Sequence, residues 1–341
     1  MPLQRPIVIL GNTAGGKSEL AVALAERLDG EVVSADSMQV YRHLDAGTAK
    51  PTPGQRRRAP HHLIDVADPR APFTVADWLA LAKQGIADIQ QRGKRPIVVG
   101  GTNLYLNALL RGLMPGPEPD ATLRAELDPL DNAELHARLT AADPAAADRI
   151  HLADRKRLIR ALEVVALTGQ PISQQQTQWQ EPSGTTPAPS ALPPPPSTYR
   201  HDPLLIGLAW PTDAINHRIN KRVRAMFFPD KEPDLAPDVV PAGESLPDEV
   251  ARLDAAGLLG RQAREALGYK QVLAHRHRDE PAYTDRAITT LDDAFERTKV
   301  LTRRFGKQQR TWMRRYRGVR WIEMPAERPI ESALAAIRDA G

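Results

Sequence analysis

The sequence predicts an α/β protein in which helices cover both faces of a parallel sheet and a helical domain is inserted into the chain. Three observations support this prediction. A glycine-rich loop follows the first apolar segment, strand-like segments alternate with helical segments along most of the chain, and this alternation stops between about residues 115 and 200. A chain of 341 residues can form one large domain or two.

The first predicted strand, residues 6–10, reads PIVIL, a short apolar run rich in β-branched side chains. It leads into GNTAGGKS, which fits the pattern G-x-x-x-x-G-K-S/T, and then into a segment with apolar residues at helical spacing up to Leu28. A loop in this position directs backbone N–H groups and the positive end of a helix dipole toward a bound phosphate. Lys17 would add a full charge, and the Ser18 hydroxyl would bind Mg²⁺. The loop residues predicted to bind phosphate are Gly11, Ala14, Gly15, Gly16, Lys17 and Ser18.

The alternation continues beyond this loop. Apolar segments at residues 31–36, 95–102, 203–211 and 319–324 are typical of buried strands, and residues 73–93 and 104–113 have the periodicity of helices. Together with the loop, this order favours a P-loop NTPase-like parallel sheet core.

The composition also predicts domain boundaries. We expect residues 1–115 to form the first part of the core and residues 201–341 the second part, which carries basic RNA-binding helices. Residues 116–200 form a helical insertion domain that ends in a Pro- and Ser-rich linker at 181–198. A second Pro-rich and acidic segment, 227–250, is predicted to be a surface loop.

Composition and charge exclude several classes of protein. The chain has no cysteine, which excludes disulfides, thiolate catalysis and cysteine-ligated zinc. No apolar stretch is long enough to span a membrane, and the N-terminal apolar run continues into the phosphate loop, so we expect no signal peptide, no membrane partner and a cytoplasmic location. The net charge is only +4, but residues 297–320 contain ten Lys or Arg, no Asp or Glu, and three aromatic residues. This segment predicts contact with a nucleic acid; the alternative is a solvated helix face.

Two further strand ends carry polar groups. Asp36 ends the second predicted strand and could be a Mg²⁺ ligand, a general base or a helix N-cap. Thr102 follows a Gly-Gly pair at the end of the third predicted strand, where it could face a ligand or cap a helix. No clear apolar strand ends in a second Mg²⁺-binding Asp; the nearest candidate is HHLIDV at residues 61–66.

Seven segments together resemble the tRNA dimethylallyltransferases (tRNA isopentenyltransferases). They are GNTAGGKS, DSMQVYRHLDAGTAKP, APHHLIDVADP, VVGGTNLYLNALL, DRKRLIRALEV, ALGYKQ and TRRFGKQQRTWMR, in the same order along nearly the whole chain. The resemblance implies that the loop holds the diphosphate of dimethylallyl diphosphate with Mg²⁺. It also implies transfer of the dimethylallyl group to the exocyclic N6 amine of adenosine 37, beside the anticodon, in tRNAs that read codons beginning with U. The implied partner is the tRNA anticodon stem-loop. A monomer of this chain would suffice for the implied mechanism.

The resemblance also assigns roles to single residues. Asp36 would accept the proton of the adenine amine, which is a general-base role. Thr13 and Thr102 would line the diphosphate pocket, and Arg222 and Arg124 would be functional arginines, so the implied catalytic residues are Asp36, Thr102, Arg222 and Arg124. The implied tRNA-binding residues are Asp36, Ser37, Met38, Gln39, Lys156, Arg157, Leu158, Ile159, Arg160, Gly268, Tyr269, Lys270, Thr302, Arg303, Arg304, Lys307, Gln308 and Gln309. From the residues alone, Lys156 to Arg160 could equally be a charged helix face, and Gly268 a helix stop.

The sequence departs from the family pattern at four positions. Asn12 stands where Pro is usual and Gly15 where Ser is usual, which predicts a looser loop; Phe305 and Gln308 stand where Tyr and Arg are commoner. The segment 227–250 could also displace the helix that carries Arg222. Two other hypotheses stay open at this point. The protein could be a P-loop kinase or ATPase acting on or with RNA, or an RNA-binding protein whose phosphate loop has lost its function.

Overall fold

The computed structural model describes residues 4–113, 116–175, 199–235, 243–280, 287–325 and 327–339. Among these residues, 4–110 and 199–339 form one compact unit, and 111–175 form a second. The predicted linker at 181–198 lies outside the described residues.

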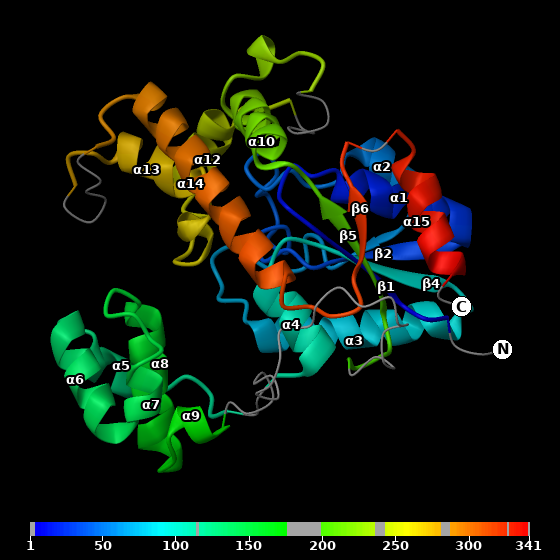
Figure 1. The fold of residues 1–341 in the computed structure, drawn as a ribbon. Coiled ribbons are helices and arrows are strands. Elements are labelled where there is room, and N and C mark those ends of the chain that lie inside the picture. The colour runs from blue at the N-terminus through cyan, green and yellow to red at the C-terminus, as the bar shows by residue number, and fades with distance from the viewer. Residues whose placement is uncertain are drawn as a thin grey trace. The chain divides into compact units, whose positions relative to one another are not determined.

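A parallel sheet organises the first unit (Figure 1). Its six strands within the described residues lie in the order β3-β2-β4-β1-β5-β6, and every pairing is parallel. The strands are β1 (Ile7–Gly11), β2 (Gly30–Ser34), β3 (His61–His62), β4 (Arg95–Val99), β5 (Leu204–Ala209) and β6 (Arg320–Glu323). The predicted α/β class is confirmed, and β3, which the sequence did not clearly indicate, has only two residues.

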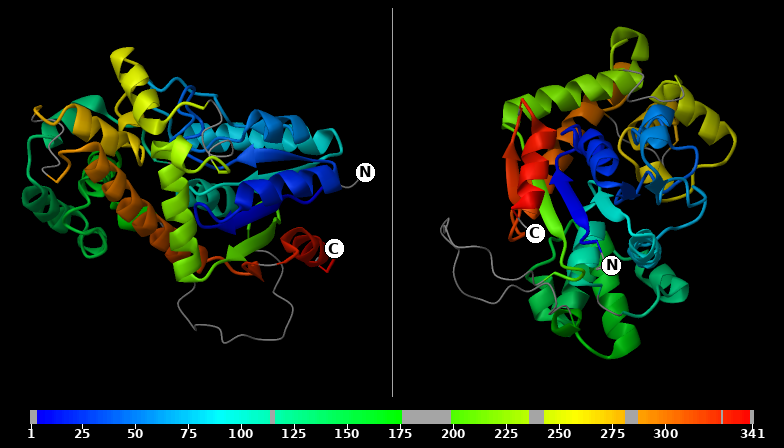
Figure 2. Two further views of the ribbon diagram at one scale, coloured as in Figure 1. Left: turned by 90° about the horizontal axis from the view of Figure 1, so that it is seen from above. Right: turned by 90° about the vertical axis from the view of Figure 1, so that its right-hand side faces the viewer.

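Helices cover both faces of this sheet (Figures 1 and 2). On one face, α1 (Lys17–Leu28) and α15 (Pro329–Arg338) pack on the central strands, and their apolar side chains share a core with Ile7, Ile9 and Ile206. On the other face lie α3 (Val75–Gln91) and α4 (Asn103–Arg111), joined by a stack of the Trp78 and Tyr105 rings at 4.6 Å. Because both faces are covered, β1 is fully buried, as its uninterrupted apolar sequence requires.

Helix starts follow capping residues in the sequence. The helices α2 (Pro53–Arg58), α3 and α14 (Leu291–Met313) each begin at a capping box, in which a threonine and a residue three positions later satisfy each other's backbone N–H groups. The helix α1 begins instead at Gly16, whose φ of 86° favours glycine.

The C-terminal half adds helices beyond the sheet. They are α10 (Thr212–Phe227), η1 (Pro229–Lys231), α12 (Leu246–Ala255), η2 (Ala263–Glu265), α13 (Tyr269–Arg276) and the 23-residue α14. The prediction of a loop over 227–250 was wrong at both ends, because Phe227 still belongs to α10 and α12 begins at Leu246. Residues 236–242 of that segment lie outside the described residues.

The second unit is helical throughout its described part. It contains α5 (Ala121–Leu127), α6 (Asn132–Ala142), α7 (Pro144–Ala147), α8 (Arg155–Thr168) and α9 (Ile172–Gln175) around a core that includes Leu135, Leu139 and Leu158. None of the helices in the described residues of either unit combines the length and the apolar composition that crossing a membrane requires.

Candidate active site

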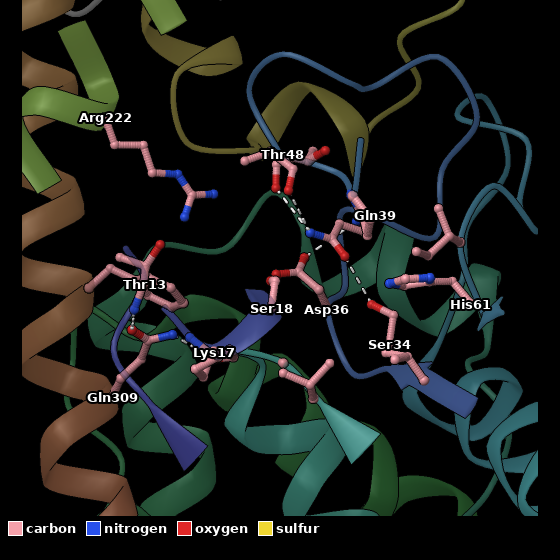
Figure 3. Close-up of a pocket in the computed structure, with 18 residues that line it drawn as sticks. Thr13, Lys17, Ser18, Ser34, Asp36, Gln39, Thr48, His61, Arg222 and Gln309 are labelled. Carbon is pink, nitrogen blue, oxygen red and sulfur yellow. Dashed lines mark hydrogen bonds between the residues drawn. The ribbon is translucent and has the colours of Figure 1, made fainter. Parts of the chain in front are cut away.

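The candidate site lies at the carboxyl ends of four neighbouring strands (Figure 3). The phosphate loop follows β1, Asp36 follows β2, the Gly100-Gly101-Thr102 turn follows β4, and Trp210 follows β5. Because parallel strands end at one edge of the sheet, segments far apart in the sequence converge there.

The phosphate loop is fastened to its surroundings at four consecutive residues. The Asn12 amide donates to the Gly306 carbonyl at 2.7 Å, and the Thr13 N–H donates to Gln309 Oε1 at 2.9 Å. Arg218 Nε donates to the Ala14 carbonyl at 2.8 Å, and Trp210 Nε1 donates to the Gly15 carbonyl at 3.0 Å. The expectation of a looser loop was therefore wrong.

The two unusual loop residues take part in this fastening. Asn12 carries the amide that reaches α14, and a proline has no such group. A side chain at Gly15 would place its Cβ 2.9 Å from the Asn12 carbonyl oxygen and 3.4 Å from the Trp210 ring nitrogen. Glycine thus permits the tight turn in which the Gly15 N–H donates to the Asn12 carbonyl at 3.1 Å.

Two cations face the cavity beside the loop. Lys17 is buried, and its ammonium donates to the Asn12 carbonyl at 2.7 Å. Burial, and then the neighbouring Arg222 guanidinium, lower the pKa of Lys17 to about 7, although Asp36 opposes the shift. Arg222 extends from α10 toward the cavity (Figure 3) and makes no hydrogen bond to any described residue. Two partly dehydrated cations at one cavity favour an anionic ligand.

Asp36 is held by backbone donors on one side only. Its Oδ1 accepts from the N–H groups of Met38, at 2.9 Å, and Gln39, at 3.3 Å. Its Oδ2 makes no hydrogen bond within the described residues. The N-cap-like geometry considered from the sequence is therefore present, and it leaves one carboxylate oxygen available to a ligand.

The turn after β4 packs tightly against this segment. Thr102 Oγ1 accepts from the Ser37 N–H at 2.9 Å and donates to Ser37 Oγ at 3.2 Å. At Gly100 an added Cβ would lie 2.1 Å from the Ala35 carbonyl oxygen, so the turn needs glycine there. Thr102 thus positions the Asp36 segment, and it lines the apolar cavity described below, not the cavity beside the loop where the diphosphate was expected.

Two cavities meet at Asp36. The first, the loop cavity, is lined by Lys17, Ser18 and the Gly100-Gly101 pair. The second, the apolar cavity, has a volume of about 480 Å³, and α10 and α14 supply ten of its 21 lining residues, including Val223, Met226 and Leu301. Five residues line both cavities, and they are Thr13, Asp36, Thr48, Arg222 and Phe305. The concern that segment 227–250 displaces Arg222 was thus unfounded.

Some of the residues expected to bind tRNA are accessible to a ligand, and others use their side chains for contacts within the protein. Ser37, Met38, Thr302, Arg304 and Gln308 line the apolar cavity, and Lys270 and Lys307 are exposed. Three others use their side chains internally. Tyr269 is buried and donates to Glu249, Gln309 is buried against the phosphate loop, and the Gln39 amide bonds Ser34, Thr48 and Ala49.

The remaining residues expected to bind tRNA are Lys156 to Arg160 in the second unit and Gly268 and Arg303 in the first. Lys156 and Arg157 are exposed on α8, Leu158 is buried in the core of that unit, and Ile159 and Arg160 are partly buried. Arg124 and Arg160 both bond the buried Glu163, Arg124 through two nitrogens at 2.7 and 2.9 Å. In the first unit, Arg303 donates to Asn220 at 2.6 Å, and Gly268 has a φ of 90° at the start of α13. The Arg124 contacts are those of a residue that stabilises the helical unit.

The protein oxygens at the loop cavity suit Mg²⁺. No three His, Asp or Glu side chains of the described residues form a group that could hold a metal ion. Mg²⁺, however, often takes one or two protein oxygens and completes its shell with water and substrate phosphates. The Ser18 hydroxyl is exposed in the same cavity as the Asp36 carboxylate. The donor set fits a cation that binds together with a diphosphate.

Sequence reasoning missed Trp210, Arg218 and Thr48. Trp210 and Arg218 hold the outer side of the loop and stack on each other at 4.7 Å. The position of Trp210 directly after an apolar strand was a signal that could have identified it, because the carboxyl ends of parallel strands share one edge.

Comparisons with known proteins agree with this geometry. Residues 39–316 match the IPP transferase family, and residues 5–59 match the isopentenyl transferase family. The chain is 42% identical over 334 residues to a tRNA dimethylallyltransferase of Geobacter sulfurreducens, which covers 96% of this chain and 95% of that protein. It is 40% identical over 344 residues to the tRNA dimethylallyltransferase of Anaeromyxobacter dehalogenans, with coverages of 98% and 100%.

Solved structures give the same result. A tRNA isopentenylpyrophosphate transferase of Bacillus halodurans aligns with a TM-score of 0.63 and 34% identity over 99% of this chain and 96% of its own. A eukaryotic dimethylallyltransferase acting on tRNA aligns with a TM-score of 0.72 over 97% of this chain and 77% of its own; at 24% identity this similarity shows the fold alone.

A phosphate loop, two cations and a carboxylate at one edge of a parallel sheet are typical of P-loop α/β enzymes that act on phosphorylated substrates. More specifically, this chain belongs to the IPP transferase family, and its curated relatives named above are tRNA dimethylallyltransferases. The resemblance seen in the sequence is confirmed.

Proposed function

We propose that this protein transfers the dimethylallyl group of dimethylallyl diphosphate to the N6 amine of adenosine 37 in tRNAs that read codons beginning with U. The observation that carries the proposal is the junction of the two cavities at Asp36. A carboxylate between a cationic phosphate site and an apolar cavity can reach both a leaving diphosphate ester and an incoming base.

The loop cavity would hold the diphosphate of the donor. Lys17, the loop N–H groups and Arg222 would stabilise the negative charge that develops as the allylic C–O bond breaks. The Ser18 hydroxyl would hold Mg²⁺, which when bound would supply further positive charge to the leaving group. The lowered pKa of Lys17 and the unpaired Arg222 guanidinium support an anion at this place.

The chemical step moves one alkyl group and one proton. The N6 nitrogen attacks the C1 carbon of the dimethylallyl group, the bond from C1 to the diphosphate oxygen breaks, and pyrophosphate leaves. The nitrogen then carries one proton too many, and Asp36 Oδ2 would accept it. A positioned base of this kind contributes typically about 10²–10⁴-fold.

The apolar cavity would receive the adenine. A base within an anticodon loop must leave its stack before an enzyme can act on its amine. Phe305 lines both cavities and offers an aromatic face, and the exposed basic residues of α14 lie on the same helix. A tRNA substrate also supports a cytoplasmic location, and the mechanism needs only one copy of the chain.

A kinase or ATPase using the same loop is the alternative. Such an enzyme usually has a second Mg²⁺-binding Asp, and the nearest candidate here is Asp65 after β3. Its carboxylate is bound by Lys50 at 2.5 Å and by Arg56 at 3.0 Å, and Asp65 is not among the residues that line the loop cavity. This arrangement favours the prenyl transfer.

One experiment tests the proposal directly. Purified protein and Mg²⁺ are incubated with unmodified tRNA that reads a UNN codon, with dimethylallyl diphosphate in one reaction and ATP in the other, and the nucleosides are analysed by mass. We expect adenosine heavier by one dimethylallyl group in the first reaction only. ATP consumption without a prenylated nucleoside would favour the kinase or ATPase instead.

A further inference from the structure

Gln309 is buried, unlike several of its polar neighbours on α14. Arg304, Lys307 and Gln308 are exposed, whereas Gln309 is 1% exposed and faces the sheet. Gly306 lies one helical turn earlier on the same side, and its carbonyl accepts from the Asn12 amide. One side of α14 is therefore turned to the phosphate loop, beside Thr13 (Figure 3).

The Gln309 amide connects two segments that line the loop cavity from different strands. Its Oε1 accepts from the Thr13 N–H in the loop after β1, at 2.9 Å. Its Nε2 donates to the Gly101 carbonyl in the turn after β4, at 2.9 Å. An amide has a donor and an acceptor on one rigid plane, so it can satisfy both groups at once. Gly101 allows the approach, because a Cβ there would lie 2.5 Å from Nε2.

We propose that Gln309 is a positioning residue for the prenyl donor, whose amide fixes the spacing between the phosphate loop and the Gly100-Gly101 turn. This inference rests on the proposed function in that the loop cavity between these two segments would hold the donor's diphosphate. The resemblance implied that Gln309 contacts tRNA. Its burial and its two backbone partners assign it to the donor site instead.

Substitution by methionine tests this role, because methionine has a similar volume and neither hydrogen-bonding group. For Gln309→Met we expect the Kd for inorganic pyrophosphate with Mg²⁺, measured by calorimetry, to rise at least about 10-fold. We expect kcat/KM for dimethylallyl diphosphate to fall about 10- to 100-fold, as for other small misplacements in active sites. The Kd for tRNA should stay within about twofold.

Gln90→Met is the matched control. Gln90 lies on α3 and donates to the Gln4 carbonyl at 2.7 Å, before β1 and therefore at the opposite end of the sheet. This variant should keep the Kd for pyrophosphate and the turnover of the unmodified protein.

Gln309→Glu gives a readout that simple loss of packing would not produce. The ionised carboxyl accepts from Thr13 but cannot donate to Gly101, whereas the protonated carboxyl has one donor and one acceptor, as the amide does. The ratio of the pyrophosphate Kd of this variant to that of the unmodified protein should therefore fall as the pH is lowered from 8 to 5.5. This variant also serves if Gln309→Met does not fold.

Three results would overturn the inference. A raised Kd for tRNA with unchanged pyrophosphate binding would make Gln309 an RNA contact. Unchanged values for both ligands would mean that the amide only fills space, and a flat pH response of Gln309→Glu would mean that its hydrogen bonds do not matter. Failure of the unmodified protein to prenylate tRNA would refute the proposed function separately, because pyrophosphate binding needs no tRNA.

Discussion

At the scale of single residues, Asp36 combines a structural and a chemical task in one carboxylate. Replacing it by asparagine keeps an oxygen for the Met38 and Gln39 N–H groups and removes the base. We expect Asp36→Asn to lower kcat by about 10²–10⁴-fold. The Kd for tRNA should change by no more than a few-fold. Single-turnover assays and tRNA binding measure the two effects.

The control for Asp36→Asn is Asp213→Asn, an exposed acid in the first turn of α10. It removes the same charge outside the two cavities and should leave kcat unchanged. Near-normal turnover by Asp36→Asn would exclude Asp36 as the base and leave it only the role of holding its own segment.

Lys17 predicts a pH dependence for donor binding. Burial and Arg222 lower its pKa to about 7 in the free protein, so Lys17 is largely uncharged above pH 7. A bound diphosphate favours the ammonium and raises the pKa of Lys17 again, so binding above pH 7 takes up a proton. The affinity for pyrophosphate should therefore fall as the pH rises above 7, by up to about tenfold per pH unit.

Calorimetry at pH 8 in two buffers with different ionisation enthalpies measures this proton uptake. The unmodified protein should take up nearly one proton more than Lys17→Arg, whose guanidinium stays charged. Since the titration of pyrophosphate itself is common to both proteins, it cancels in the comparison. Equal uptake by the two proteins would mean that Lys17 is already charged at pH 8.

At the scale of elements, α8 carries two different kinds of basic residue. Arg160 is held by the buried Glu163, which also holds Arg124 of α5, whereas Lys156 is exposed and has no ion pair within the described residues. If α8 contacts a tRNA phosphate, Lys156→Glu should raise the KM for tRNA several-fold through the lost contact and the new repulsion. The KM for dimethylallyl diphosphate should not change.

Arg138→Glu makes the same change of charge on α6 of the helical unit, where Arg138 is exposed and pairs with Glu134. It should leave the KM for tRNA within about twofold after allowance for long-range charge effects. A similar rise for both variants would mean that the unit attracts RNA only through its overall charge and that α8 has no specific role.

The elements also show how far the sequence could predict the structure. Strands β1, β2, β4 and β5 were recognisable because buried parallel strands are largely apolar runs. Strand β6 was recognisable from its aromatic and β-branched residues, although only Ile322 in it is buried. The two-residue β3 has no such run. The loop, Asp36 and the Gly-Gly-Thr turn could be placed at one edge because strand ends converge there. Which side of α14 faces the phosphate loop could not be predicted, because the many basic residues around Gly306 and Gln309 indicated an exposed helix. The roles of Trp210 and Arg218 could not be predicted because neither residue belongs to a known motif.

At the scale of the whole molecule, a net charge of +4 says little, but the placement of the basic residues makes a quantitative prediction. Eight exposed basic side chains lie on α8, on α14 and directly after α14, and they are Lys156, Arg157, Arg297, Arg304, Lys307, Arg314, Arg315 and Arg317. If each neutralises one phosphate, a plot of log K for tRNA against log salt should have a slope of about −6 to −7.

Titration of tRNA binding between 50 and 300 mM KCl tests this prediction. Pyrophosphate binding, measured in the same buffers, is the internal control: its cations, Lys17 and Arg222, lie in a cavity where salt screens them less. A slope near −6 for tRNA would show that most of these side chains, on both units, contact RNA phosphates. A slope of about −1 would identify residues 297–320 as the solvated helix face that the sequence left as the alternative, and recognition of tRNA would then depend on the apolar cavity alone.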